Sequence, residues 1–135
     1  MSAKSLKSVY VDQNGYKSFQ NKTNDFYQVM RLSLDAGLWN GVGLNAAHCV
    51  ISLNDALTVY FLRKRFSGDD HRHASLLLSQ LPIESIKQYV NAFEKIISKK
   101  HMVAYEEREF RQSEALEIVK QTERFYQWGM SQLPQ

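Results

Sequence analysis

The scarcity of chain-breaking residues is the feature that most constrains the fold of this chain. Its 135 residues contain two prolines and six glycines, the residue types that most often interrupt helices. The long segments between them carry apolar residues at steps of three and four, which is the spacing of one helix face and not the alternation of a strand. We therefore expect an all-α protein, and no segment predicts a strand.

The apolar spacing predicts five helices with short links. They cover these ranges: about Tyr16 to a stop at Gly37, about Asn40 to Phe66, a cap at Asp69 or Asp70 to Pro82, Ile83 to about Lys100, and a cap at Ser113 to about Leu133. Such an order predicts an up-and-down bundle of four to five antiparallel helices. The polar segment 101–112 is expected to be a connection, which Tyr105 pins against the bundle.

The length and the 44% hydrophobic content suit one compact domain. We expect residues 16–135 to form this domain and residues 1–15, which are polar and rich in lysine, to be an amino-terminal arm. No window approaches the roughly 20 apolar residues of a membrane span, and the start lacks the apolar stretch of a secretory signal. The expected compartment is the cytoplasm, with no membrane partner.

Cys49 is the only cysteine, so no intramolecular disulfide can form. It lies in the apolar run 46–51, which favours a buried structural thiol over a nucleophile. The chain has no Gly-rich phosphate loop, no nucleophile elbow and no zinc-finger spacing. No cofactor or metal is therefore expected.

Basic residues gather in two short segments of a chain with a formal charge of +3 and a pI near 9.0. This charge permits phosphate or nucleic-acid binding without requiring it. The first segment contains Arg63, Lys64, Arg65, His71, Arg72 and His73, and the second is Lys99, Lys100 and His101. Each segment is either a solvated helix end or a phosphate-binding surface.

A line of polar residues follows the second predicted helix. Asn45, His48, Ser52 and Asp55 are separated by steps of three, four and three, so they share one face. Burying them without hydrogen-bond partners would be costly. We expect this polar line to face either the cleft of a dimer or a hydrogen-bond network inside one bundle.

Three segments carry a resemblance to a known family. They are residues 25–40, residues 44–58, and Ala104-Tyr-Glu followed by Glu114-Ala and Glu123-Arg-Phe. In this order and spacing they resemble the opening helix and turn, the central helix, and the connection and closing helix of the HEPN family, named for higher eukaryotes and prokaryotes and for nucleotide binding. The resemblance runs from about Asp25 to Leu133.

The resemblance implies a helical bundle that usually dimerises. Some members are metal-independent RNases, acting alone as toxins or beside a minimal nucleotidyltransferase, whereas others bind nucleotides or only assemble. The RNase members resemble one another in an Arg followed, after four to six residues, by a His at a helix junction, contributed by both protomers to one cleft. Arg65 and His71 match this spacing, although Phe66 stands where a polar residue usually follows the Arg.

Two hypotheses on function follow. The favoured one is a homodimeric module, in a toxin-antitoxin or defence setting, that binds a nucleotide, RNA or a partner protein such as a nucleotidyltransferase or antitoxin. Its expected contacts are Arg63, Lys64, Arg72, His73, Asn45, His48, Ser52 and Asp55. The alternative is a metal-independent endoribonuclease, in which His71 performs acid–base chemistry and Arg65 binds the phosphate.

These residues also have structural interpretations. His71 can cap a helix, and Arg65 can form an ion pair with Asp69 or Asp70. On a helix His73 would point away from His71, so it is expected to be an auxiliary phosphate contact, as is the neighbouring Arg72. A competing metal site would use His71, His73, Asp69 and Asp70, without an established ligand spacing.

Overall fold

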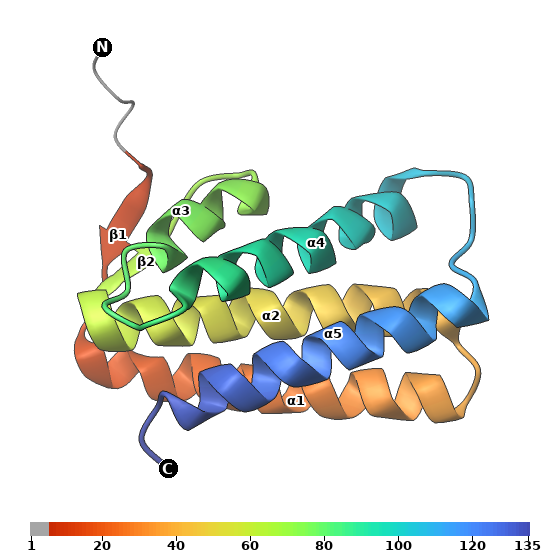
Figure 1. Cartoon of the computed structure of the whole chain (residues 1–135), viewed down its shortest axis with the longest axis horizontal. Coiled ribbons are helices and arrows are strands. Elements are labelled where there is room, and N and C mark those ends of the chain that lie inside the picture. Colours follow the sequence, from red (N-terminus) through yellow and green to blue (C-terminus); the bar gives the residue numbers. More distant parts are fainter. Residues whose placement is uncertain (1–5) are drawn as a thin grey trace.

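The structure is a computed structural model that describes residues 6–135 and is mostly helical (Figure 1). Its elements are β1 (Ser8–Tyr10), the 3₁₀ helix η1 (Gln13–Gly15), α1 (Tyr16–Asp35), α2 (Trp39–Leu62), β2 (Lys64–Phe66), the 3₁₀ helix η2 (His71–His73), α3 (Ala74–Leu78), α4 (Ile86–Tyr105) and α5 (Gln112–Ser131). The all-α prediction is confirmed in its main part. The expectation of no strand is wrong, because β1 and β2 form a small antiparallel sheet.

Helix α1 ends where the sequence predicts a stop. Gly37 has a φ of 73°, a left-handed conformation that glycine adopts at no steric cost. The backbone N–H of Leu38 then donates to the carbonyl of Ser33 at 2.9 Å. After this turn α2 packs closely on α1, since a Cβ on Gly41 would lie 3.2 Å from the Ser33 hydroxyl.

The end of α2 differs from the prediction. Arg63 has a φ of 54° and ends the helix after Leu62, so residues 64–66 leave it as β2 and pair with β1. Helical periodicity cannot reveal this, because the pairing strand lies far earlier in the chain. The segment 6–15 of the predicted amino-terminal arm holds β1 and η1, and residues 1–5 lie outside the described part.

A cap begins the third helical segment. Asp70, one of the two predicted caps, accepts a hydrogen bond from the backbone N–H of Arg72 at 3.0 Å, which satisfies a free donor at the start of η2. Helix α3 continues directly from η2. The link to α4 carries Leu81, which is 3% exposed and belongs to the core.

Helix α4 begins and ends later in the sequence than predicted. It begins at Ile86 rather than Ile83 and continues to Tyr105, so the first part of the expected connection is helical. Met102 and Val103 explain the continuation, because both pack against the core and give these last turns an apolar side.

Helix α5 is capped by a different residue from the one predicted. Its amino-terminal cap is Arg111, whose backbone N–H donates to the carboxylate of Glu114 at 2.9 Å. Ser113 lies inside the helix. The guanidinium of Arg108 also donates to Glu114, at 2.8 and 2.7 Å, so one carboxylate orders both the connection and the start of the helix.

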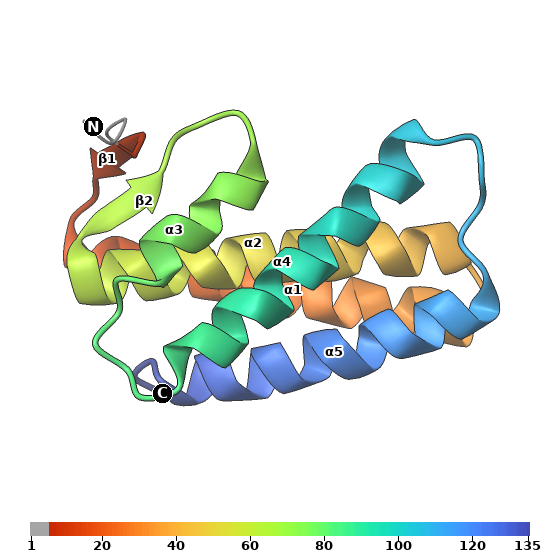
Figure 2. The same ribbon diagram turned by 45° about the horizontal axis from the view of Figure 1, so that its top comes forward.

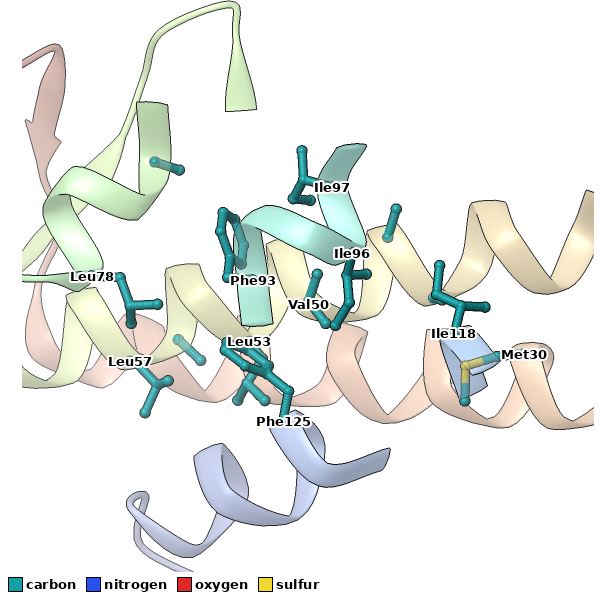
Figure 3. Close-up of a cluster of buried hydrophobic side chains, with 14 of the residues drawn as sticks. Met30, Val50, Leu53, Leu57, Leu78, Phe93, Ile96, Ile97, Ile118 and Phe125 are labelled. Atoms are coloured by element: carbon teal, nitrogen blue, oxygen red, sulfur yellow. The ribbon is translucent and has the colours of Figure 1, made fainter. Parts of the chain in front are cut away.

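The four long helices lie side by side, and consecutive ones run in opposite directions (Figures 1 and 2). Their apolar faces meet in one core (Figure 3), whose largest fully buried side chains include Met30, Val50, Leu53, Leu57, Phe93, Ile96, Ile118 and Phe125. Helix α5 approaches α2 closely at Gly129, where a Cβ would lie 2.6 Å from Leu53. The polar line of α2 projects from another side of that helix than Val50, Leu53 and Leu57.

Candidate functional site

The polar line of α2 is largely covered by neighbouring elements. His48 is half-buried, with its ring centroid 5.3 Å from that of Phe26 in α1. Ser52 and Asp55 are each 7% exposed. Asn45 donates its side-chain amide to a backbone carbonyl one turn earlier in the same helix, at 2.8 Å. The four side chains are therefore not open to bulk solvent, as both interpretations of the polar line require.

Asp55 is the end of this line that reaches β2. Its Oδ2 lies 3.5 Å from the Nε of Arg65 in an ion pair, and the Arg65 guanidinium carbon lies 5.3 Å from the ring centroid of Phe19. The carboxylate and the ring, which come from α2 and α1, thus hold the guanidinium between them. The ion pair expected for Arg65 with Asp69 or Asp70 is wrong, since Asp55 takes that place.

Burial dominates the ionisation of Asp55. It raises the pKa of this carboxyl group to about 6, while the charges of Arg65 and Lys22 act in the opposite direction. A buried carboxylate beside an arginine suits a positioning role better than direct contact with a ligand. Asp55, predicted as a binding residue, therefore fixes Arg65 in this structure.

His71 lies where basic side chains from three elements converge. It is half-buried at the start of η2, and its pKa is lowered first by burial and then by the charges of Lys100, His48 and Arg65, against the opposing charge of Asp70. Burial and Lys100 also lower the pKa of His48. We call His48, Arg65, His71 and Lys100 the basic cluster.

A cavity of about 250 Å³ opens beside the basic cluster, between η2 and α4. One wall is formed by residues 69–72 and the other by Ile97, Lys100, His101 and Tyr105 of α4. These four positions of α4 share one helix face because they are spaced by three, one and four residues. The cavity thus joins a predicted site residue, His71, to a helix face that was not assigned to the site.

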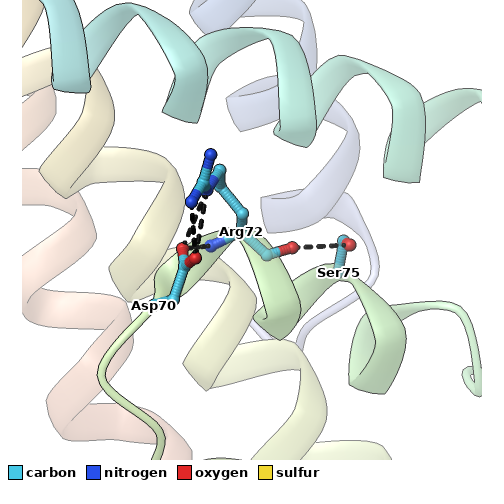
Figure 4. A network of polar contacts seen from close by, with 3 residues as sticks. All are labelled: Asp70, Arg72 and Ser75. Atoms are coloured by element: carbon cyan, nitrogen blue, oxygen red, sulfur yellow. Dashed lines mark hydrogen bonds and ion pairs between the residues drawn. The ribbon is translucent and has the colours of Figure 1, made fainter.

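Arg72 lines the cavity beside the basic cluster but is paired with a carboxylate, whereas His73 lines another cavity. The guanidinium of Arg72 binds the carboxylate of Asp70, with contacts of 2.7 to 3.1 Å (Figure 4), so this cation is already neutralised. His73 points to the other side of η2, as expected, and lines a second cavity of about 440 Å³ with Leu6 and Leu76. Only His71 of the two histidines faces α4.

The remaining predicted contacts lie apart from the cavity. Arg63 and Lys64 are exposed, at the end of α2 and in β2, and neither lines the cavity beside the basic cluster. Within residues 6–135, no group of three or more His, Cys, Asp or Glu side chains is placed to hold a metal ion. The competing metal site fails geometrically, because His71 and His73 line different cavities.

Cys49 is fully buried, and burial raises the pKa of its thiol to about 12. A thiol in this environment stays protonated and is a poor nucleophile. The fold therefore supports the prediction that Cys49 is a buried structural thiol and not a nucleophile.

Lys100, His101 and Tyr105 are the residues that the sequence did not assign to the site. Lys100 and His101 were recognised only as a basic segment, because the helix was expected to end there. Extending the apolar stripe of α4 from Ile97 would have placed all three on one face. Tyr105 does not pin the connection to the bundle, since 74% of it is exposed.

Comparisons with known proteins add no assignment. No family model matches this sequence, and no curated protein matches it. Among the residues that the structure describes, no helix is both long enough and apolar enough to cross a membrane.

Proposed function

We propose that this chain is a HEPN-like dimeric module that binds RNA through its phosphates, and that the basic cluster is the phosphate site. The observation that supports this proposal is that the half-buried His71 and Lys100 line the same cavity, with His48 and Arg65 near enough for their charges to lower the pKa of His71. Groups of like charge repel one another, more strongly where burial excludes water. A bound phosphate would relieve this repulsion and accept hydrogen bonds from the same groups.

Two adjacent lysines provide a direct test. Lys100 lines the cavity beside the basic cluster, whereas Lys99 lines a different cavity, with Glu114 and Glu117. Replacing either by alanine removes the same charge from the same turn. Lys100→Ala should weaken the binding of a labelled RNA in fluorescence anisotropy and reduce the dependence of log K on log salt by about one unit. Equal effects of Lys99→Ala and Lys100→Ala would contradict the proposal.

The protonation of the two histidines in the basic cluster gives a second test, the pH dependence of RNA binding. The pKa values of His48 and His71 lie below their ordinary range without a ligand, and a phosphate would stabilise their protonated forms. Affinity for RNA should therefore rise as the pH falls from about 7 to about 5.5. The profile is measured in the Asp55→Asn background, because Asp55, with a pKa of about 6, otherwise titrates in the same range. His71→Ala should flatten this profile, while His73→Ala, two residues along and in the other cavity, should preserve it.

Exposed apolar residues support the dimer. Val29 and Leu32 of α1, Leu38 of the following turn and Leu44 of α2 have exposures between 36% and 66%. Exposed apolar side chains on neighbouring elements can form an interaction surface where they are contiguous. In analytical ultracentrifugation, Leu32→Asp should shift the dimer toward monomer. Leu116→Asp, the same substitution at an exposed leucine of α5, should not. A native chain that stays strictly monomeric at high concentration would contradict this part of the proposal.

Metal-independent RNA cleavage is the second candidate function, and the position of the half-buried His71 in the cavity wall, with Arg65 held nearby by Asp55, favours it. A neutral imidazole can accept the proton of a ribose 2′-hydroxyl, whose oxygen then bonds to the adjacent phosphorus while the bond from phosphorus to the 5′-oxygen breaks and that oxygen takes a proton from water. Arg65, held by Asp55, would stabilise the charge that develops on the phosphate.

Cleavage is tested on a mixed pool of structured and single-stranded RNA in excess chelator, which suppresses metal-dependent contaminants. The native chain should cleave, and both His71→Ala and Arg65→Ala should lose activity, with His73→Ala as the matched control. Equal activity in all variants would point to contamination. No cleavage by a folded dimer that still binds RNA would leave the binding function alone.

A further inference from the structure

We propose that the cavity between η2 and α4 holds one unpaired nucleotide of an RNA strand, with its base against Tyr105 and its phosphate beside His71 and Lys100. This inference rests on the proposed function and specifies which form of RNA the site accepts. A base that is stacked and paired inside a duplex cannot be splayed out onto a protein side chain. The site should therefore prefer single-stranded RNA.

Tyr105 is placed as a stacking surface. It is 74% exposed, one of the most exposed large side chains of the described chain, although it lies in the last turn of α4 and not in a loop. Its ring lies at the rim of the cavity, 5.2 Å from the His101 ring at an angle of 47°. A base on this ring would cover apolar surface that water now contacts, and bases of any identity can stack in this way.

The rest of the cavity suits a group of about the size of one base. Ile97 is 4% exposed and forms an apolar part of the α4 wall. The volume of about 250 Å³ is smaller than the roughly 300–1,000 Å³ of pockets for drug-sized ligands. One base can therefore enter, while its phosphate and the strand on either side stay at the opening of the cavity.

The charges of the walls fit a nucleotide better than a simple anion. Lys100 and His71 offer donors to a phosphate, but the carboxylates of Asp69 and Asp70 line the same cavity and would repel an anion placed beside them. Asp70 is neutralised by Arg72. A base can approach these oxygens, because its exocyclic amino group donates hydrogen bonds to carboxylates.

Base stacking is tested separately from phosphate binding. A short unstructured RNA and an abasic sugar–phosphate strand of the same length, both labelled, are titrated with the full chain in fluorescence anisotropy at one ionic strength. Tyr105→Ala should weaken binding of the RNA by about 5- to 100-fold and leave binding of the abasic strand unchanged. Tyr105→Phe should bind RNA normally, because it keeps the ring. Tyr10→Ala is the matched control, since Tyr10 is 73% exposed and lies in β1, away from this cavity.

The outcomes separate this inference from the proposed function. An equal loss on RNA and on the abasic strand, or no difference between Tyr105→Ala and Tyr10→Ala, would overturn base stacking while leaving phosphate binding in place. Tighter binding of a duplex than of the single strand would overturn it as well. If the native chain bound neither strand, the proposed function itself would fall.

Discussion

Asp55→Asn should stabilise this protein at neutral pH and not at acidic pH. A buried carboxyl group with a raised pKa binds its proton more tightly in the folded state than in the unfolded chain. Its contribution to stability is therefore most favourable at low pH and is lost as the pH rises from the unfolded value, 3.8, through the folded value, about 6. Asparagine keeps the shape of the side chain and removes the charge.

The size of the effect follows from the two pKa values. A difference of about two units corresponds to about 3 kcal/mol at pH 7, because Asp55 is ionised there in both states. The pKa of about 6 already includes the attraction of Arg65, so the loss of this ion pair is not subtracted a second time. The expected gain is about 3 kcal/mol, or roughly 10 °C in melting temperature for a chain of this length.

Thermal unfolding followed by circular dichroism at pH 7 and pH 4 measures this difference. Asp25→Asn, the same change at an exposed position of α1, is the matched control. RNA affinity of Asp55→Asn should fall, because Arg65 loses the partner that holds it toward the basic cluster. An equal change of stability at both pH values, or a loss at pH 7, would refute the argument from burial.

Three further substitutions test the fold. Gly129→Ala should lower the free energy of unfolding by about 1–2 kcal/mol in urea titrations, since the added Cβ meets the fully buried Leu53 and the clash exceeds the gain of about 1 kcal/mol in helix propensity. Glu114→Gln should destabilise only slightly, because glutamine keeps the hydrogen bond at the start of α5 and loses only the charge pair with the exposed Arg108. Because hydrogen bonds, first of all from Arg108, lower the pKa of Glu114 to about 2, its contribution is present above pH 4.5 and lost below it, so the variant and the native chain should converge in acid. Arg63→Gly should stabilise by about 1 kcal/mol by relieving the positive φ without changing RNA affinity.

Apolar spacing alone predicts the long helices, but not where two of them end. The sequence predicts the end of α1 because Gly37, a residue that favours the left-handed conformation, stands there. Arg63 takes the same conformation at the end of α2, but arginine does not favour it, so the sequence does not predict that end. What holds the chain there is the pairing of β2 with β1, a long-range interaction that no local pattern records.

The sequence predicts those residues of the candidate site that lie within one segment of the chain, but not those brought together by packing. Arg65 and His71 are singled out because their spacing resembles the Arg–His motif of the HEPN RNases, and the polar line is found by its period on α2. The contributions of Lys100 and Tyr105 depend on how α4 lies beside η2, which is a tertiary relationship. The sequence does not predict the pairing of Asp55 with Arg65 for the same reason, since Asp69 and Asp70 are nearer to Arg65 in the chain.

The distribution of carboxylates indicates which cations are left for a ligand. Asp55 is committed to Arg65, and Asp70 is committed to Arg72. Among the ion pairs of residues 6–135, none includes Lys100. A phosphate at the cluster would thus find one cation fixed at Arg65 and one unpaired at Lys100. Loss of Lys100 should therefore lower RNA affinity more than loss of the Asp55–Arg65 pair, because Lys100 contributes an unpaired charge whereas Asp55 acts only through the position of the Arg65 guanidinium.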